Sequence, residues 1–128
     1  MLDTHIAIWL TVSPDTLRPL ERAVLARRDH KLLLSTIAIW EVRMKWEAVE
    51  RRGLPHRIPS PMDVVALASG YSIEVVGLTV ADHLASLRVP IAHNDPFDAM
   101  MLVHTQQLGA KLLTRDGKLR AHPLSLPL

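Results

Sequence analysis

Short runs of β-capable residues alternate with segments of helical periodicity along the chain, and this alternation limits the possible folds more than any other feature. The β-capable runs cover residues 32–35, 73–76 and 111–114, and helix-like segments separate them. Strands that are separated by helices usually pair in parallel, because each helix carries the chain back to the same end of the sheet. The sequence therefore predicts an α/β fold with a parallel sheet wrapped in helices.

Local signals indicate where three helices begin and where one ends. Ser13 and Asp95 each precede a proline, which is typical of a helix N-terminus, and Thr36 precedes an apolar run with helical spacing. Gly109 follows the last helical run, at the place where a glycine commonly stops a helix. The chain is then expected to return to the sheet through residues 111–114.

Length and composition indicate one domain and exclude several classes of protein. A chain of 128 residues with 48% hydrophobic residues can bury one core, so we expect residues 1–128 to form a single domain. The absence of cysteine excludes disulfides, thiolate zinc sites and cysteine nucleophiles. The apolar runs are far shorter than the roughly 20 residues that cross a bilayer. With no signal-peptide pattern after Met1, we expect a cytoplasmic protein without membrane association.

Two acidic residues follow predicted strands, at the edge where open parallel sheets bind ligands. Asp116 comes two residues after Thr114, and Asp3 follows a short N-terminal strand. Ligands of such folds bind beyond the carboxyl ends of the strands, so both positions are candidates for a functional site. Aspartate also caps turns, and for either residue alone that structural role is the better explanation.

Glu41 occupies an unusual place on its predicted helix. On a helical wheel of residues 37–50 it shares an angle with Met44, whereas Arg43 lies on the solvent side. The pattern predicts that the Glu41 carboxylate faces the core. Because burying an unpaired charge is costly, a cation must compensate it, either a bound metal ion or the side chain of Lys45 one helical turn later.

Two carboxylates three residues apart open the last predicted helix. Asp95 fits the N-cap position, and Asp98 at the third helical position can interact favourably with the helix dipole. One acid suffices as the cap, so Asp98 is equally well explained as a side chain that points across the end of the sheet.

The acidic candidates gain meaning as a group. The group consists of Asp3, Glu41, Asp98 and Asp116. A set of carboxylates with no thiolate and few imidazoles suits Mg²⁺ or Mn²⁺, which prefer oxygen ligands. Closely packed carboxylates repel one another, so such a cluster would need the cation to hold it together.

Four separate blocks of the sequence resemble the PIN domain, and within it the VapC toxins. The most specific block is His93-Asn94-Asp95-Pro96-Phe97-Asp98, which is similar to a His-x-Asp-Pro-Phe-Asp segment of that family. The other blocks, in chain order, are Leu2-Asp3-Thr4-His5, Ile39-Trp40-Glu41-Val42 and Leu112-Leu113-Thr114-Arg115-Asp116. Their order and spacing over nearly the whole chain make the resemblance specific.

The resemblance implies a PIN fold over residues 1–128, with a central parallel sheet of four to five short strands flanked by helices. It implies that one set of residues is catalytic and binds Mg²⁺ or Mn²⁺: Asp3, Glu41, Asp98 and Asp116. A second set would support these ligands: Thr4, Asp95 and Thr114. Asp95 looks more like the helix cap than a ligand, although adjacent carboxylates could exchange roles. Many relatives have Arg where this chain has Ala99, so a phosphate contact at that position would be absent.

The resemblance also implies an activity and partners. Members of the family are typically endoribonucleases of toxin-antitoxin systems, so we expect an RNA substrate, a VapB-like antitoxin and a homodimer. Two alternatives remain, a non-catalytic PIN module that binds RNA or a protein, and another metal-dependent phosphoesterase that uses the same carboxylates. Metal binding distinguishes the first alternative from the ribonuclease, and a panel of substrates distinguishes the second.

Overall fold

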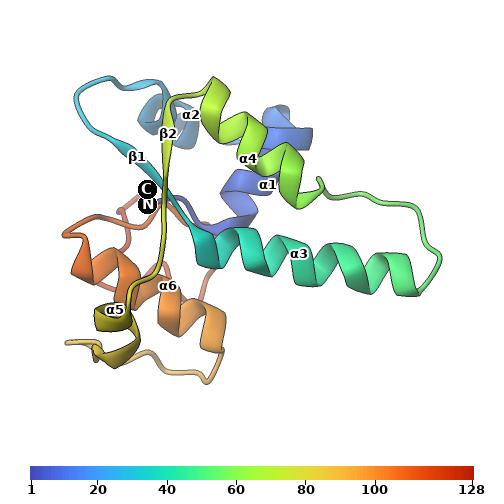
Figure 1. The fold of residues 1–128 in the computed structure, drawn as a ribbon. Helices are drawn as coiled ribbons and strands as arrows, with labels where there is room; N and C mark the ends of the chain where they lie inside the picture. Colours follow the sequence, from blue (N-terminus) through green and yellow to red (C-terminus); the bar gives the residue numbers. More distant parts are fainter.

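Helices surround a narrow parallel sheet in the computed structural model, which describes residues 1–128 (Figure 1). The elements follow in the order α1 (Thr4–Val12), η1 (Pro14–Thr16), α2 (Pro19–Ala26), β1 (Leu32–Ser35), α3 (Thr36–Arg51), α4 (Pro61–Gly70), β2 (Ile73–Val76), α5 (Val80–Leu84) and α6 (Pro96–Gln107). None of these helices combines the length and the apolar character that crossing a bilayer requires.

The sheet contains two regular strands and three shorter extended segments. β1 and β2 pair in parallel, with Leu32 opposite Ile73. Leu2 forms single parallel bridges to β1 on one side and to Leu113 on the other, and the segment around Leu113 is bridged in turn to Ser125. The expected parallel α/β arrangement is confirmed, and β1 and β2 have the expected bounds.

The expected number of four to five strands is too high, because only β1 and β2 are regular strands. The N-terminal segment pairs through one residue, Leu2, and α1 begins two residues later at Thr4. The run at residues 111–114 pairs only through Leu112 and Leu113. All five segments nevertheless run in the same direction, so their carboxyl ends share one edge.

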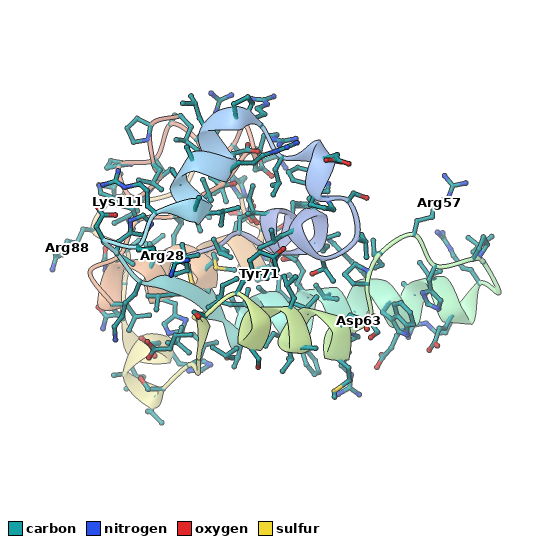
Figure 2. The ribbon with its side chains drawn as sticks, turned by 90° about the horizontal axis from the view of Figure 1, so that it is seen from above. Arg28, Arg57, Asp63, Tyr71, Arg88 and Lys111 are labelled. Atoms are coloured by element: carbon teal, nitrogen blue, oxygen red, sulfur yellow. The ribbon has the colours of Figure 1, made fainter.

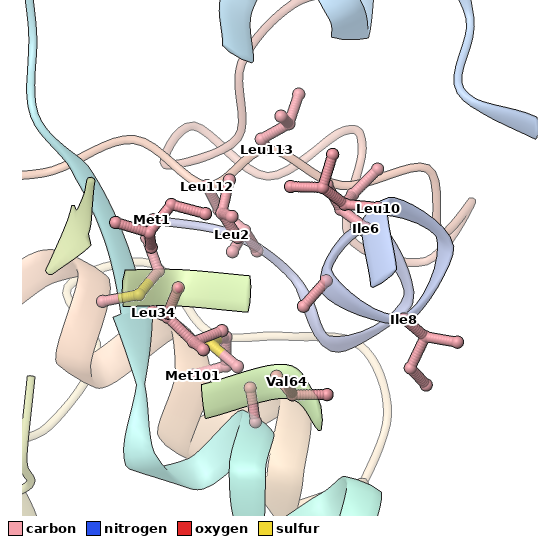
Figure 3. Close-up of a cluster of buried hydrophobic side chains, with 14 of the residues drawn as sticks. Met1, Leu2, Ile6, Ile8, Leu10, Leu34, Val64, Met101, Leu112 and Leu113 are labelled. Atoms are coloured by element: carbon pink, nitrogen blue, oxygen red, sulfur yellow. The ribbon is translucent and has the colours of Figure 1, made fainter. Parts of the chain in front are cut away.

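The hydrophobic core lies between these segments and the helices. Figure 3 shows Leu2 and Leu34 from the sheet beside Val64 of α4 and Met101 of α6. All four side chains are buried, and they belong to one contiguous cluster of apolar residues. Burial on this scale is the main force that holds the helices against the sheet. The segments that precede the acidic residues are thereby fixed in position.

The first expected helix start is wrong, and the second is displaced by one residue. Ser13 precedes only the short 3₁₀-helix η1 and makes no capping hydrogen bond, while α2 begins at Pro19. A proline disfavours helical backbone in the residue before it, and Arg18 is extended accordingly, so no helix runs through this position. The N-cap of α3 is Ser35 rather than Thr36, because the Ser35 hydroxyl accepts the hydrogen bond of the Ile37 N–H group.

The last helix begins and ends as the sequence predicts. The Asp95 carboxylate accepts hydrogen bonds from the N–H groups of Phe97 (2.9 Å) and Asp98 (3.4 Å), which satisfies the first turn of α6. Gly109 has a φ of 60°, a left-handed conformation that glycine adopts at little cost. Asp95 therefore acts as the helix cap, and the carboxylate of Asp98 is not needed for that role.

The outer half of α3 extends away from the sheet as an arm. α4 lies beside α3 and returns the chain to the body, and the loop that joins them forms the outer end (Figure 1). Figure 2 shows Arg57 at this end, pointing away from the rest of the molecule. Arg57 is exposed and takes part in no ion pair or hydrogen bond, which makes it a suitable control position for experiments on other arginines.

Candidate functional site

The candidate acids lie at the carboxyl edge of the sheet. Asp3 directly follows Leu2, Asp116 follows the bridge at Leu113, and Glu41 belongs to α3, which begins where β1 ends. Asp98 lies in the first turn of α6. The fold thus brings together residues from four segments that are far apart in the sequence.

Asp3 is the most deeply buried acid of the group. Its residue is only 7% exposed, and its carboxylate accepts a hydrogen bond from the Thr114 hydroxyl. Although Asp3 occupies the N-cap position of α1, its side chain makes no capping hydrogen bond, so the turn-capping explanation is wrong for this residue. Burial raises the pKa of the Asp3 carboxyl, the Thr114 hydrogen bond opposes that rise, and the nearby charge of Glu41 adds to it.

Glu41 faces α1 and is held by two neighbours. The Thr4 hydroxyl donates a hydrogen bond to one carboxylate oxygen, and the Lys45 ammonium group lies 2.7 Å from the other. The glutamate side chain is 20% exposed. The Lys45 partner that the sequence offered as an alternative to a metal ion is therefore present.

The prediction that Glu41 faces the core is wrong. Met44, which shares its side of the helical wheel, is 41% exposed, whereas the fully buried residues of α3 are Ala38 and Val42. The core stripe is therefore centred one position away from the predicted one, because α3 packs against α1, α4 and α6 through this side. Glu41 lies at the margin of this stripe, where it is accessible to a ligand.

Asp98 has an unsatisfied carboxylate among other acids. Its pKa is raised to about 6 by partial burial and by the charges of Asp95, Asp116 and Asp3. His93 is the nearest possible counter-charge, with its Nε2 atom 3.6 Å from an Asp98 oxygen, too far for a good hydrogen bond. That Nε2 atom is buried and has no hydrogen-bond partner. No lysine or arginine side chain therefore pairs with the Asp98 carboxylate.

Asp116 caps the turn that follows it and also belongs to the group of four acids. Its carboxylate accepts a hydrogen bond from the Lys118 N–H group at 2.7 Å, so it does cap the next turn, as the structural explanation requires. Its own N–H group donates to the Thr114 hydroxyl at 3.0 Å. Thr114 thereby connects Asp116 to Asp3, and the two acids are placed by one buried side chain.

Sequence reasoning missed the ion pair that supports this loop. Arg115, next to Asp116, forms a two-point contact with Glu21 of α2, and its guanidinium also lies 4.2 Å from the centre of the Trp9 ring. The Glu21 side chain is 4% exposed and that of Arg115 is 18% exposed. Glu21 in a first helical turn is commonplace, so only the spatial neighbourhood reveals this partnership.

The Glu21–Arg115 pair predicts a loss of stability in acid. Its hydrogen bonds with Arg115 hold the pKa of Glu21 below the usual 4.5. A carboxylate with a lowered pKa stabilises the fold above that value, and the contribution is lost as the pH falls below it. We expect urea unfolding to show a larger acid-induced loss for the parent than for Glu21→Gln. Equal losses in the two proteins would show that the pair does not contribute to the pH dependence.

The donor chemistry of the site fits a hard divalent cation, whereas the spacing in this conformation does not yet form a binding site. All four acids offer oxygen ligands, and burial together with neighbouring acidic groups raises the pKa of Asp3 and of Asp98. No three acidic or histidine side chains converge closely enough to hold a metal ion as they stand. Binding would require rotation of side chains such as Asp98, which no hydrogen bond restrains.

Comparison with known proteins identifies relatives over almost the whole chain. The family model described as PIN domain matches residues 1–123, which include all four acids. The chain is 26% identical over 123 residues to Ribonuclease VapC22 of Mycobacterium tuberculosis, and the match covers 95% of this chain and 90% of that protein. No solved structure matches the chain significantly.

Proposed function

The chain belongs to the PIN domain family, and from this premise we propose that it is a VapC-type endoribonuclease that depends on Mg²⁺ or Mn²⁺. The proposal assigns the catalytic and metal-binding roles to the acids at the carboxyl edge of the sheet: Asp3, Glu41, Asp98 and Asp116. The ribonuclease activity is supported by the name of the relative VapC22. The metal requirement is supported by the chemistry of these side chains.

The main support for the proposal is that the Asp98 carboxylate lies near acids from other segments and has no lysine or arginine partner. A carboxylate that only caps or stabilises a helix does not need three acidic neighbours. Burial, and after it the charges of Asp95, Asp116 and Asp3, raise the pKa of Asp98 to about 6. A structural site would relieve this repulsion with a lysine or arginine. Glu41 has such a partner in Lys45, whereas the candidate next to Asp98 is the imidazole of His93, 3.6 Å away. A divalent cation would offset the repulsion.

The protein's own residues prepare the site for the reaction. When bound, the divalent ion would supply charge neutralisation at the phosphodiester and lower the pKa of an attacking water. Thr114 holds Asp3 and the backbone of Asp116 in place, and Thr4 holds Glu41. Asp95 fixes the first turn of α6, which carries Asp98. Ligands oriented in advance lose less freedom when the substrate binds.

In the proposed reaction water attacks the phosphorus and the bond to the 3′-oxygen breaks, so we expect a 5′-phosphate and a 3′-hydroxyl on the RNA fragments. Ribonucleases that use the RNA 2′-hydroxyl instead produce 2′,3′-cyclic phosphates. End analysis of fragments by mass spectrometry distinguishes these products. Cyclic phosphate ends from the purified protein would contradict the mechanism.

The same site suggests how a VapB-like antitoxin would inhibit the enzyme. A basic side chain of the partner, placed on an apolar helix, would neutralise the acids without taking part in chemistry. Lys45 already does this within the chain, 2.7 Å from Glu41. Together with the RNA substrate, such an antitoxin is the partner that the proposal requires. The homodimer and the cytoplasmic location stay predictions.

Metal binding tests the proposal without knowledge of the RNA sequence. We expect calorimetry to detect Mn²⁺ binding by the purified protein and a loss of at least about tenfold in affinity for Asp98→Asn, which removes one ligand charge. Asp15→Asn is the matched control, since the Asp15 side chain is fully exposed and lies near the opposite edge of the sheet. Absence of binding by the folded parent would favour the non-catalytic PIN module.

A further inference from the structure

A second candidate site lies at the amino edge of the sheet, opposite the acids. It is an open cleft with a volume of about 770 Å³, within the range of ligand sites. Three connections form its walls: the turn from α1 to η1, residues 27–31 between α2 and β1, and the turn from α4 to β2. Leu32 lines the cleft at the first residue of β1, so the length of the strand separates this cleft from the acids that follow the carboxyl ends.

Basic side chains dominate the polar lining of the cleft. Arg22, Arg27, Arg28 and Lys31 contribute four positive charges, whereas Asp15 is the one acidic residue of the lining. Arginine is well suited to phosphate, because its planar guanidinium donates two parallel hydrogen bonds to an oxyanion. The floor of the cleft is apolar and includes Leu10 and Leu17, both buried. The cleft therefore offers an anion positively charged side chains next to an apolar surface.

Not all of these charges have strong partners within the protein. Arg28 makes no hydrogen bond or ion pair. Arg27 pairs with Asp29 and Lys31 pairs with Glu74, but each of these four side chains is more than half exposed. Exposed ion pairs of this kind contribute little to stability, so a bound phosphate can replace the acidic partner at small cost.

An aromatic residue lines the same cleft as the unpaired arginine. Tyr71 is 57% exposed and lines the same cleft as Arg28, and Figure 2 shows the two residues on neighbouring loops. The next residue, Ser72, has a φ of 55°, which is costly for a residue other than glycine. Tyr71 and Ser72 of this turn both line the cleft. An exposed ring beside a basic rim is the combination that stacks a base and holds its phosphate.

We propose that this cleft binds a nucleotide, with its phosphate on Arg28 and the neighbouring basic residues and its base against Tyr71. The nucleotide can be free or one unit of a single-stranded RNA, since both present the same chemistry. The proposal does not depend on the catalytic role of the acids, which lie at the other edge of the sheet. In an RNA strand, the cleft would hold a part of the chain distant from the cleaved bond.

Nuclear magnetic resonance tests the proposal on the full chain in the absence of divalent ions. Titration with adenosine monophosphate is expected to shift the amide signals of Arg28, Tyr71 and Ser72, but not those of Asp3 and Asp98. We expect Arg28→Ala to weaken this binding about tenfold, as the loss of one charge-assisted contact does, while Arg57→Ala leaves it unchanged. Tyr71→Leu should weaken binding by about tenfold and Tyr71→Phe should not, because the phenylalanine ring still stacks on the base.

Further results show whether the ligand is RNA or a free nucleotide, and others would contradict the proposal. If a short single-stranded RNA shifts the same amide signals at a much lower concentration than the mononucleotide does, the ligand is RNA. If both ligands need the same concentration, the ligand is a free nucleotide. Inorganic phosphate that binds as tightly as adenosine monophosphate would overturn the role of Tyr71. No shift at the cleft, or equal weakening by Arg28→Ala and Arg57→Ala, would overturn the site itself. The four substitutions lie at three exposed positions, so they are not expected to affect folding, which circular dichroism verifies.

Discussion

Cleavage of RNA is expected to fall at least about 100-fold when Asp98 is replaced by asparagine, because the variant loses the charge of one proposed metal ligand. The fold should persist, since the Asp98 carboxylate accepts no hydrogen bond from the protein and the substitution removes a charge that its neighbours repel. The metal-free variant should therefore melt at the same temperature as the parent or higher. The measurements are the rate of RNA cleavage with Mn²⁺ present and thermal unfolding without it.

Asp95→Asn provides the matched control three residues away. Asparagine caps a helix about as well as aspartate, so this variant removes the same charge and keeps the N-terminus of α6 intact. If Asp95 is the cap and Asp98 the ligand, Asp95→Asn retains most of the cleavage activity. The opposite pattern, with activity lost at Asp95 and retained at Asp98, would show that the two neighbouring carboxylates have exchanged roles.

The largest effect on stability is expected for Arg115→Ala. The substitution leaves the Glu21 carboxylate buried without its partner and removes the hydrogen bond from Arg115 to the Thr16 carbonyl oxygen. It also removes the guanidinium from the Trp9 ring. Breaking a buried ion pair by deleting one member costs about 3 kcal/mol, and we expect a loss of this size in the free energy of unfolding measured with urea.

The exposed Arg27–Asp29 pair is the appropriate comparison for this measurement. It has the same two-point geometry, yet both side chains are about 60% exposed. Arg27→Ala should therefore change the free energy of unfolding little. If the two alanine variants prove equally stable, burial does not strengthen the Glu21–Arg115 pair, and another contact must hold the loop that carries Asp116.

The elements with strong local signals could be predicted from the sequence. The capping role of Asp95 and the bounds of β1 and β2 depend on neighbouring residues, and the structure agrees with them. The placement of acids at one edge followed from parallel topology, which brings the ends of all strands to the same side. That reasoning was sufficient to group Asp3 with Asp116 but not to determine which atoms they contact.

Features that depend on packing between distant segments could not be predicted. The rotation of α3 that exposes Met44 depends on how closely α1 approaches Ala38 and Val42, and a helical wheel of one segment holds no information about its neighbour. The burial of Glu21 likewise depends on a partner 94 positions further along the chain. The basic cleft has the same origin, because its walls come from three separate turns.

The position of Leu2 between β1 and the segment at Leu113 has a consequence for the order of events during synthesis. Leu2 lies in the middle of the sheet, and its second neighbour, Leu113, is synthesised only after most of the rest of the domain. The hydrogen bond between Asp3 and the Thr114 hydroxyl also forms late, because the two residues are 111 positions apart. Contacts of such long range slow folding, because the chain must close a large loop before it gains their stabilisation. A nascent or C-terminally truncated chain that ends before Leu112 therefore cannot assemble the acidic site, however much of its helical structure has already formed.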